Sequence, residues 1–316
     1  MSFLPIKIEN FVQHMDQDEL PALIVRYFHE EVVGRSPHTL YARKTDLGKF
    51  CLFYHAINGH LQVKGLMPQD VKLYLNDLEA KGYAANSRNR QLGSIRAFGS
   101  WLLENGFVKI HPCKSIRDVH VDLGVPKAPR DREYHRLRKA AEVRATNTGF
   151  RFSQHFRDMV ILETLNSSGL RISELLSIKL GQLKGKRFHN VKCKGGKVRS
   201  ISIKSGTCEL IGTYVSSHRT EGSEYLFTSK NGLQLDRVTV WKSLKKIAQA
   251  ASANLQPHEK MTLHPHMLRH RHGFKSREAK DAVFAAARLG HCSLNFVHRY
   301  TQETTEEEQI ILEKID

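Results

Sequence analysis

A stretch rich in proline and glycine, residues 111–132, limits most strongly what this chain can fold into. Four helix-breaking residues interrupt any helical period there: Pro112, Gly124, Pro126 and Pro129. At 316 residues the chain also exceeds the usual size of one domain. We therefore expect two domains, residues 1–120 and 133–316, joined by a linker at 121–132, and we expect each domain to bury its own core.

The residues before this stretch show apolar positions at helical spacing. Three helices are predicted, over residues 36–54, 68–82 and 87–105. Pro37 suits the first turn of the first helix, and Gly82 and Gly106 are suitable stops for the other two. The N-terminal domain is therefore expected to be helical.

The residues after the stretch show a mixed pattern. Helical periods cover residues 134–143 and 156–167, and they return from Val238 to the end of the chain. Between them, the alternating segments F-H-N-V-K-C-K and V-R-S-I-S-I are joined by Gly195-Gly196, which is a hairpin signal. The chain as a whole is expected to be mainly α with a small β-sheet.

Positive charge is concentrated in the second part of the chain. The net charge is +17, but residues 1–120 hold 15 Lys and Arg against 12 Asp and Glu, whereas residues 121–300 hold 33 against 14. The last sixteen residues reverse the sign, with six acidic residues against Lys314 alone. Basic surfaces release condensed counterions when they neutralise phosphates, so a nucleic acid is the expected partner.

The cysteines and the hydropathy argue against several classes of protein. The five cysteines are scattered and never form a C-x-x-C pair, which speaks against a disulfide framework and against a thiolate zinc site. Neither a leader peptide nor an apolar run approaching twenty residues is present. A reducing cytoplasm, with no membrane partner, is therefore expected.

A candidate nucleophile lies near the end of the chain. Tyr300 follows His291 by nine residues in L-G-H-C-S-L-N-F-V-H-R-Y-T. A tyrosine hydroxyl, with a pKa of about 10, needs help to attack at neutral pH. Residues suited to holding a phosphate and moving protons lie upstream, in S-G-L-R-I-S-E-L, K-C-K-G-G-K-V-R and H-P-H-M-L-R-H: Arg171, Lys194, Lys197, His266 and Arg269. The sequence therefore predicts an enzyme that acts on a phosphodiester.

These motifs, in this order, resemble those of the tyrosine recombinases, the group of phage integrases, Xer-type resolvases and Cre-like enzymes. The intervals are similar too, with 23 residues from Arg171 to Lys194 and 22 from Arg269 to His291. Residues 36–54 and 86–105 resemble the helical core-binding domain of that family. The resemblance implies a SAM-like N-terminal DNA-binding domain and a mixed α/β catalytic domain of tyrosine recombinase type.

The resemblance also implies a role for each site residue. Arg171 and Arg269 would bind the non-bridging oxygens of the scissile phosphate, with Glu174 orienting Arg171. Tyr300 would form a covalent 3′-phosphotyrosine, and Lys194 would protonate the departing 5′-oxygen, although Lys197 remains an alternative. His266 would act as an acid, base or hydrogen-bond donor, and His291 would support the same transition state. Neither a metal nor any other cofactor is implied.

Other basic residues are candidates for DNA contacts. Lys197 and Arg199 would contact backbone phosphates. Three arginines of the third predicted helix suit a DNA backbone or groove, or alternatively a solvated basic face: Arg88, Arg90 and Arg96. After Arg269 the family usually shows a small hydroxyl residue and an apolar helix, whereas this chain has a basic segment that includes Arg271 and Lys275.

A cluster of histidines, His264, His266, His270 and His272, invites a zinc interpretation, because His266 and His270 are four residues apart. The sequence offers no H-E-x-x-H motif and no nearby carboxylate or cysteine to complete such a site. We therefore expect no metal.

The expected partner is double-stranded DNA with short inverted-repeat core sites, bound by a dimer per site and a tetramer in the synapse. The acidic tail with Ile310, Ile311, Leu312 and Ile315 would dock on a neighbouring protomer or pack on its own domain. The outcome of the reaction would be integration, excision or resolution of DNA through a Holliday junction. The protein would act in the cytoplasm, on the DNA of the nucleoid. The rival hypotheses are a type IB topoisomerase-like or telomere-resolving enzyme, and a non-catalytic sequence-specific DNA-binding protein.

Overall fold

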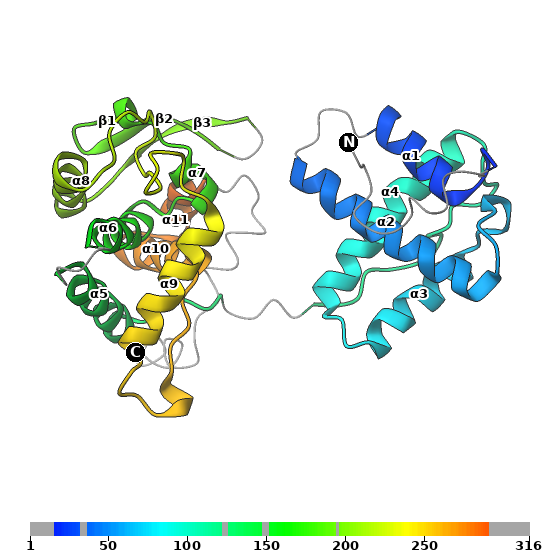
Figure 1. Cartoon of the computed structure of the whole chain (residues 1–316). Coiled ribbons are helices and arrows are strands. Elements are labelled where there is room, and N and C mark those ends of the chain that lie inside the picture. The colour runs from blue at the N-terminus through cyan, green and yellow to red at the C-terminus, as the bar shows by residue number, and fades with distance from the viewer. Residues whose placement is uncertain (1–15, 32–36, 122–125, 147–151, 194–195, 291–316) are drawn as a thin grey trace. The chain divides into compact units, whose positions relative to one another are not determined.

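The computed structural model describes residues 16–31, 37–121, 126–146, 152–193 and 196–290. The chain divides into two compact units, residues 1–122 and 123–316 (Figure 1). Helices dominate both units in the described residues, and unit 2 adds one three-stranded sheet. The prediction of a mainly α chain with a small β-sheet is therefore confirmed. No described helix is both long enough and apolar enough to cross a membrane.

Unit 1 contains four α-helices in its described residues: α1 (Leu20–Glu30), α2 (Pro37–Asn58), α3 (Pro68–Ala80) and α4 (Ala85–Glu104). Proline at the first position of α2 and α3 suits a helix start, because its missing N–H would have no partner there. In α3 the Asp70 carboxylate also accepts a hydrogen bond from the Met67 N–H at 2.8 Å. α1 was not predicted, although its buried residues Leu20, Ile24 and Tyr27 follow a helical period.

The core of unit 1 lies where α2 packs against α4. Phe50 and Tyr54 of α2 are buried in the same cluster as Phe98 and Trp101 of α4. A buried hydrogen bond from the Tyr74 hydroxyl to Gln91 Oε1, at 2.6 Å, ties α3 to α4. This packing fixes the face on which the arginines of α4 are presented.

Unit 2 is built around α6 (Phe152–Ser168), which packs against α5 (Asp131–Thr146), α8 (Ser205–Ser217), α9 (Arg237–Ala251) and α10 (Pro265–Ala279) (Figure 1). Val160, Leu162 and Leu165 of α6 are completely buried. Two short helices complete the unit within its described part, α7 (Ile172–Leu176) and α11 (Ala282–Leu289), and α11 packs against α10. α6 therefore supports the loop that follows its C-terminus.

The sheet of unit 2 is antiparallel, in the order β1 (Leu183–Lys184), β2 (Arg187–Lys192) and β3 (Val198–Ser202). Phe188 and Val191 of β2 face the core, and the register shifts between them, where Asn190 adopts a φ of 54°. The predicted hairpin is confirmed, because the Cys193 N–H donates to the Lys197 carbonyl at 2.7 Å.

Two expectations need correction, and one further helix was not predicted. The chain is not helical throughout from Val238, because residues 252–264 contain only a 3₁₀ turn, Pro257–Glu259. Helix α8 was missed. The predicted linker 121–132 extends two residues too far, because α5 begins at Asp131. At the start of this helix the Glu133 carboxylate accepts a hydrogen bond from the Arg130 N–H at 2.7 Å.

Candidate active site

Arg171 lies at the start of α7, in the loop that follows α6, and is held there by Glu174. Its backbone N–H donates to Glu174 Oε2 at 3.0 Å, and its Nη1 donates to Glu174 Oε1 at 2.7 Å. The Glu174 side chain is 3% exposed, whereas that of Arg171 is 27% exposed. A buried carboxylate therefore fixes a guanidinium that still reaches solvent.

Glu174 stays charged in this site. Burial by itself would raise the pKa of Glu174, but the backbone and side-chain hydrogen bonds from Arg171, with the charges of Arg171 and Arg269, leave the pKa below its ordinary value. The ionised carboxylate can therefore hold its arginine at any pH near neutrality.

Arg269 of α10 is almost completely buried and joins the loop before α7 to the end of α11. Its Nη1 donates to the Gly169 carbonyl at 2.5 Å, and its Nη2 donates to the Leu289 carbonyl at 2.6 Å. Gly169 belongs to the loop that carries Arg171, and Leu289 ends α11. Arg269 thus fixes the distance between this loop and the end of α11.

Gly169 can be nothing but glycine in this arrangement. Its φ is +64°, and a Cβ atom would lie 2.4 Å from His272 Cδ2 and 3.0 Å from Leu289 Cδ2. The ring of His272 therefore lies directly against the loop backbone.

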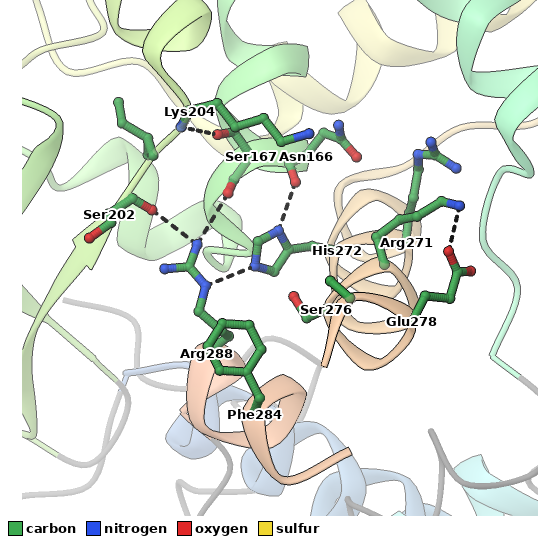
Figure 2. Close-up of a pocket in the computed structure, with 13 residues that line it drawn as sticks. Asn166, Ser167, Ser202, Lys204, Arg271, His272, Ser276, Glu278, Phe284 and Arg288 are labelled. Atoms are coloured by element: carbon green, nitrogen blue, oxygen red, sulfur yellow. Dashed lines mark hydrogen bonds and ion pairs between the residues drawn. The ribbon is translucent and has the colours of Figure 1, made fainter. Parts of the chain in front are cut away.

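His272 is a buried, neutral histidine with a hydrogen-bond partner at each ring nitrogen (Figure 2). Its Nδ1 is 2.9 Å from the Asn166 carbonyl, and Arg288 Nε donates to its Nε2 at 3.3 Å. Burial lowers the pKa of His272 to about 4, with the charge of Arg288 acting in the same direction. The neutral ring therefore carries its proton on Nδ1. Arg288 also donates to the Ser202 carbonyl at 3.0 Å, which ties α11 to β3.

His266, near the start of α10, lies in the electrostatic field of the two site arginines. Although the residue as a whole is exposed, partial burial of its ring lowers the pKa, and His264, Arg269 and Arg171 lower it further. His266 is therefore neutral at neutral pH and able to accept a proton. The zinc interpretation gains nothing, because no group of three or more His, Cys, Asp or Glu is suitably arranged for a metal ion among the described residues.

Arg199 of β3, expected to contact a backbone phosphate, makes polar contacts within unit 2. Its Nε donates to Cys193 Sγ at 3.2 Å, and its Nη1 donates to the Arg288 carbonyl at 2.6 Å. Its Nη2 is 3.7 Å from Glu174 Oε2, and 20% of the side chain is exposed. Lys197, across the hairpin from Cys193, is exposed.

Arg271 and Lys275 of α10 also make contacts within unit 2. Arg271 donates to the Pro129 carbonyl at 2.9 Å and to Asp131 Oδ1 at 2.6 Å, and it lies over the Tyr134 ring. Lys275 Nζ donates to Asp131 Oδ2 at 2.8 Å. A DNA phosphate would have to replace Asp131 at both cations, so their expected DNA contact stays a prediction.

The three arginines of α4 differ in how they are paired. Arg88 is 11% exposed and pairs with an exposed Glu79. Arg90 is the reverse, because its side chain is 49% exposed and its partner Asp46 is completely buried. Arg96 donates to the Ile116 carbonyl at 3.1 Å and to Asp118 at 3.0 Å.

The structure thus brings Arg171, Glu174, Arg269 and His266 into one neighbourhood. Three of the predicted catalytic residues lie outside the described residues: Lys194, His291 and Tyr300. The supporting roles of Gly169, His272 and Arg288 were not predicted from the sequence. The only available signals were the glycine before Arg171 and the unusual basic residues after Arg269.

Comparison with known proteins gives two family matches. The profile described as Phage integrase family matches residues 130–307, and that described as Phage integrase, N-terminal SAM-like domain matches residues 26–106. The tyrosine recombinase XerC of Roseiflexus castenholzii is 27% identical over 276 residues, which are 84% of this chain and 83% of that protein. XerD of Shewanella oneidensis is 27% identical over 277 residues, 85% of this chain and 87% of that protein.

Solved structures share the fold. A lambda integrase fragment, determined as a dimer bound to a COC′ core site, has a TM-score of 0.71 at 16% identity and covers 92% of this chain and 97% of its own. The Tn1549 transposon integrase in complex with transposon right end DNA has a TM-score of 0.73 at 16% identity. The match covers 94% of this chain and 99% of the integrase chain.

The close approach at Gly169 generates a stability prediction. Gly169→Ala should destabilise the protein by roughly 2–5 kcal/mol, because the left-handed backbone is strained for alanine and the methyl group would displace His272. Gly212→Ala is the matched control, since Gly212 lies within α8 with no heavy atom near the added methyl group, and it should be neutral or stabilising by up to about 1 kcal/mol. Denaturant unfolding would measure both, and equal effects would contradict the packing argument.

Proposed function

Because this chain belongs to the phage integrase family, it is a tyrosine recombinase that breaks and rejoins DNA strands, and we propose that Tyr300 is its nucleophile. The Tyr300 oxygen attacks the scissile phosphorus, and the bond from phosphorus to the 5′-oxygen breaks. The products are a 3′-phosphotyrosine and a free 5′-hydroxyl. The phosphodiester energy is kept in the covalent bond, so rejoining by the 5′-hydroxyl of a partner strand needs no ATP.

The arrangement of Arg171, Glu174 and Arg269 is the observation that carries this proposal. A planar guanidinium matches the non-bridging oxygens of a phosphate and keeps its charge through the reaction. Arg171 uses one N–H edge on the buried Glu174, and 27% of its side chain remains exposed to take a phosphate. Arg269 adds a second positive charge to the same site. Because these charges are fixed before DNA arrives, they stabilise the pentacoordinate transition state without a metal ion.

The proton transfers are assigned to His266 and to a lysine of the hairpin. His266 is neutral because its pKa is lowered, so it can accept the Tyr300 proton during the attack. Lys194 supplies a proton to the departing 5′-oxygen, with Lys197 as the alternative donor on the same turn. His291 donates a hydrogen bond to the phosphate.

The test of this proposal uses DNA that the protein itself selects. Incubating wild-type protein with a random-sequence duplex pool nicked on one strand, and recovering the DNA that becomes covalently attached, should yield the cognate core site. Tyr300→Phe should abolish the adduct while retaining DNA affinity, because only the attacking oxygen is lost.

The same experiment separates the rival functions. Specific binding of the wild-type protein without an adduct would favour a non-catalytic DNA-binding protein. Relaxation of a supercoiled plasmid that lacks the selected site would favour the topoisomerase alternative. Exchange between two duplexes that carry the site, with a Holliday junction intermediate, is the expected result.

We further propose that unit 1 binds the core site through Arg90 rather than Arg88. An arginine held by a buried carboxylate presents its guanidinium outward, and this is the geometry of Arg90 on Asp46. The Ser94 hydroxyl also donates to Asp46, at 2.8 Å, which fixes the carboxylate further. Arg88 has the opposite geometry, with the cation covered and its carboxylate exposed.

Salt titrations of DNA binding would test this assignment. Arg90→Gln should lower affinity and reduce the slope of log affinity against log salt by about 0.9, the effect of one lost phosphate contact. Arg88→Gln removes the same charge two positions away on the same helix, so it is the matched control, and it should leave the slope unchanged. Equal slopes for the two variants would contradict the assignment.

We propose that a dimer occupies each core site and that two dimers form the synapse through their C-terminal tails. Beside α10 and α11 lies a cavity of about 810 Å³ that is lined in part by the ring of Phe284 (Figure 2). Its lining also includes four cationic side chains: Lys204, Arg271, Lys275 and Arg288. The tail combines Glu306, Glu307 and Glu308 with the apolar Ile310, Ile311 and Leu312, so it complements this cavity in charge and in character. The cytoplasmic nucleoid is the corresponding place of action.

Truncation of the tail tests the assembly. Removing residues 305–316 should reduce cooperativity on DNA with two inverted half-sites and leave affinity for a single half-site unchanged, because only the contact between protomers is lost. Gel-shift titrations on the two DNAs would measure this. Unchanged cooperativity would indicate that the tail packs on its own domain.

A further inference from the structure

We propose that Arg199 is a positioning residue that sets three parts of the active site in register, rather than a contact to a DNA phosphate. The inference rests on the proposed function of Arg171 and Tyr300. It is carried by the contacts of one guanidinium group, whose three nitrogen atoms each lie next to a different segment of unit 2.

The first contact is with the hairpin. Arg199 pairs with Val191 across the two strands, and its Nε donates to Cys193 Sγ at 3.2 Å. The Cys193 thiol is 3.6 Å from the Val191 carbonyl, which fixes the direction of the sulfur. Cys193 directly precedes Lys194 in the sequence. Arg199 therefore holds the last described residue before the proposed proton donor.

The second contact is with the end of α11. Arg199 Nη1 donates to the Arg288 carbonyl at 2.6 Å, one of the carbonyls that a helix C-terminus leaves without an intrahelical partner. Gly290, in the left-handed conformation, closes over the same guanidinium, because a Cβ atom there would lie 3.0 Å from Arg199 Cζ. Gly290 directly precedes His291. The backbone that enters the His291 to Tyr300 segment thus rests on Arg199.

The third contact is with the carboxylate that orients Arg171. Arg199 Nη2 is 3.7 Å from Glu174 Oε2, the same oxygen that accepts the Arg171 backbone N–H. Glu174 therefore lies between two guanidinium groups, hydrogen-bonded to Arg171 and in a longer ion pair with Arg199. Moving Arg199 would release Glu174 on one side and allow Arg171 to shift.

A phosphate contact explains these observations less well. Only 20% of the Arg199 side chain is exposed, and Glu174 already offsets its charge at short range. A planar guanidinium can donate to two segments at once and place its third nitrogen beside Glu174, whereas a lysine ammonium cannot span these three groups. Displacement of reacting groups by about 1 Å can slow catalysis by roughly 10²-fold, so a residue that never touches DNA can still control the rate.

The test compares Arg199→Gln with Arg187→Gln on the duplex that wild-type protein recovers as a covalent adduct. Arg187 is a matched control, because it lies on the adjacent strand β2 and its Nε donates to the Ser202 hydroxyl at 3.2 Å. At saturating protein, Arg199→Gln should lower the single-turnover rate of adduct formation by roughly 10²-fold. Its DNA affinity and salt slope should remain as in the wild type. Arg187→Gln should leave the rate unchanged.

A conservative variant distinguishes positioning from charge. Arg199→Lys keeps the charge but loses the fork, so it should be almost as slow as Arg199→Gln. Retained DNA affinity would show that both variants are folded. A salt slope reduced by about 0.9 with a normal saturated rate, or a full restoration of rate by Arg199→Lys, would overturn the inference. Absence of any adduct from wild-type protein would instead reject the proposed function.

Discussion

The buried guanidinium of Arg269 is the interaction on which the rest of the site depends. Its bonds to the Gly169 and Leu289 carbonyls join a loop from the middle of unit 2 to the end of its last described helix. A buried cation must be satisfied by good hydrogen bonds, because an unpaired charge in the interior is very unfavourable. The loop and the helix end therefore cannot separate without leaving this charge unpaired or exposing it to solvent, and the position of Arg171 follows from that constraint.

Further contacts around Arg269 make the connection between the Gly169 loop and the end of α11 rigid. Gly169 allows His272 to pack directly on the loop backbone, and His272 in turn accepts from Arg288. Because burial keeps His272 neutral, it adds no further positive charge to a region that is already rich in arginine. Arg199 meets the same region from the sheet. The helices and the hairpin thus hold the site through backbone carbonyls as much as through side chains.

The sequence predicted the longer elements well for physical reasons. α2, α4, α5 and α6 have apolar periods of several turns, so their signals were unambiguous, and the Gly-Gly turn identified the hairpin. α8 was missed because its sequence S-G-T-C-E-L-I-G-T-Y-V-S-S includes glycine and hydroxyl residues that usually mark loops. Only tertiary contacts, such as burial of Ile211 and Tyr214, stabilise it as a helix.

The chemistry of single residues was harder to predict, because a sequence gives the type of a side chain but not its partner. Arg88 and Arg90 are two positions apart on one helix. In the ion pair of Arg88 the guanidinium is the more buried group, whereas in that of Arg90 the carboxylate is the buried group. The difference arises from Asp46 of α2 and Glu79 of α3, which belong to other helices.

In the basic segment after Arg269, too, the role of each side chain depends on its partner. Its charges suggested a surface for DNA, but Arg271 binds the start of α5 and His272 binds the end of α6. These two side chains point to different neighbours because consecutive helical residues are about 100° apart around the axis. A run of basic residues on one helix can therefore contribute to the internal scaffold of the domain. Identical side-chain chemistry takes its role from the partner that the fold supplies.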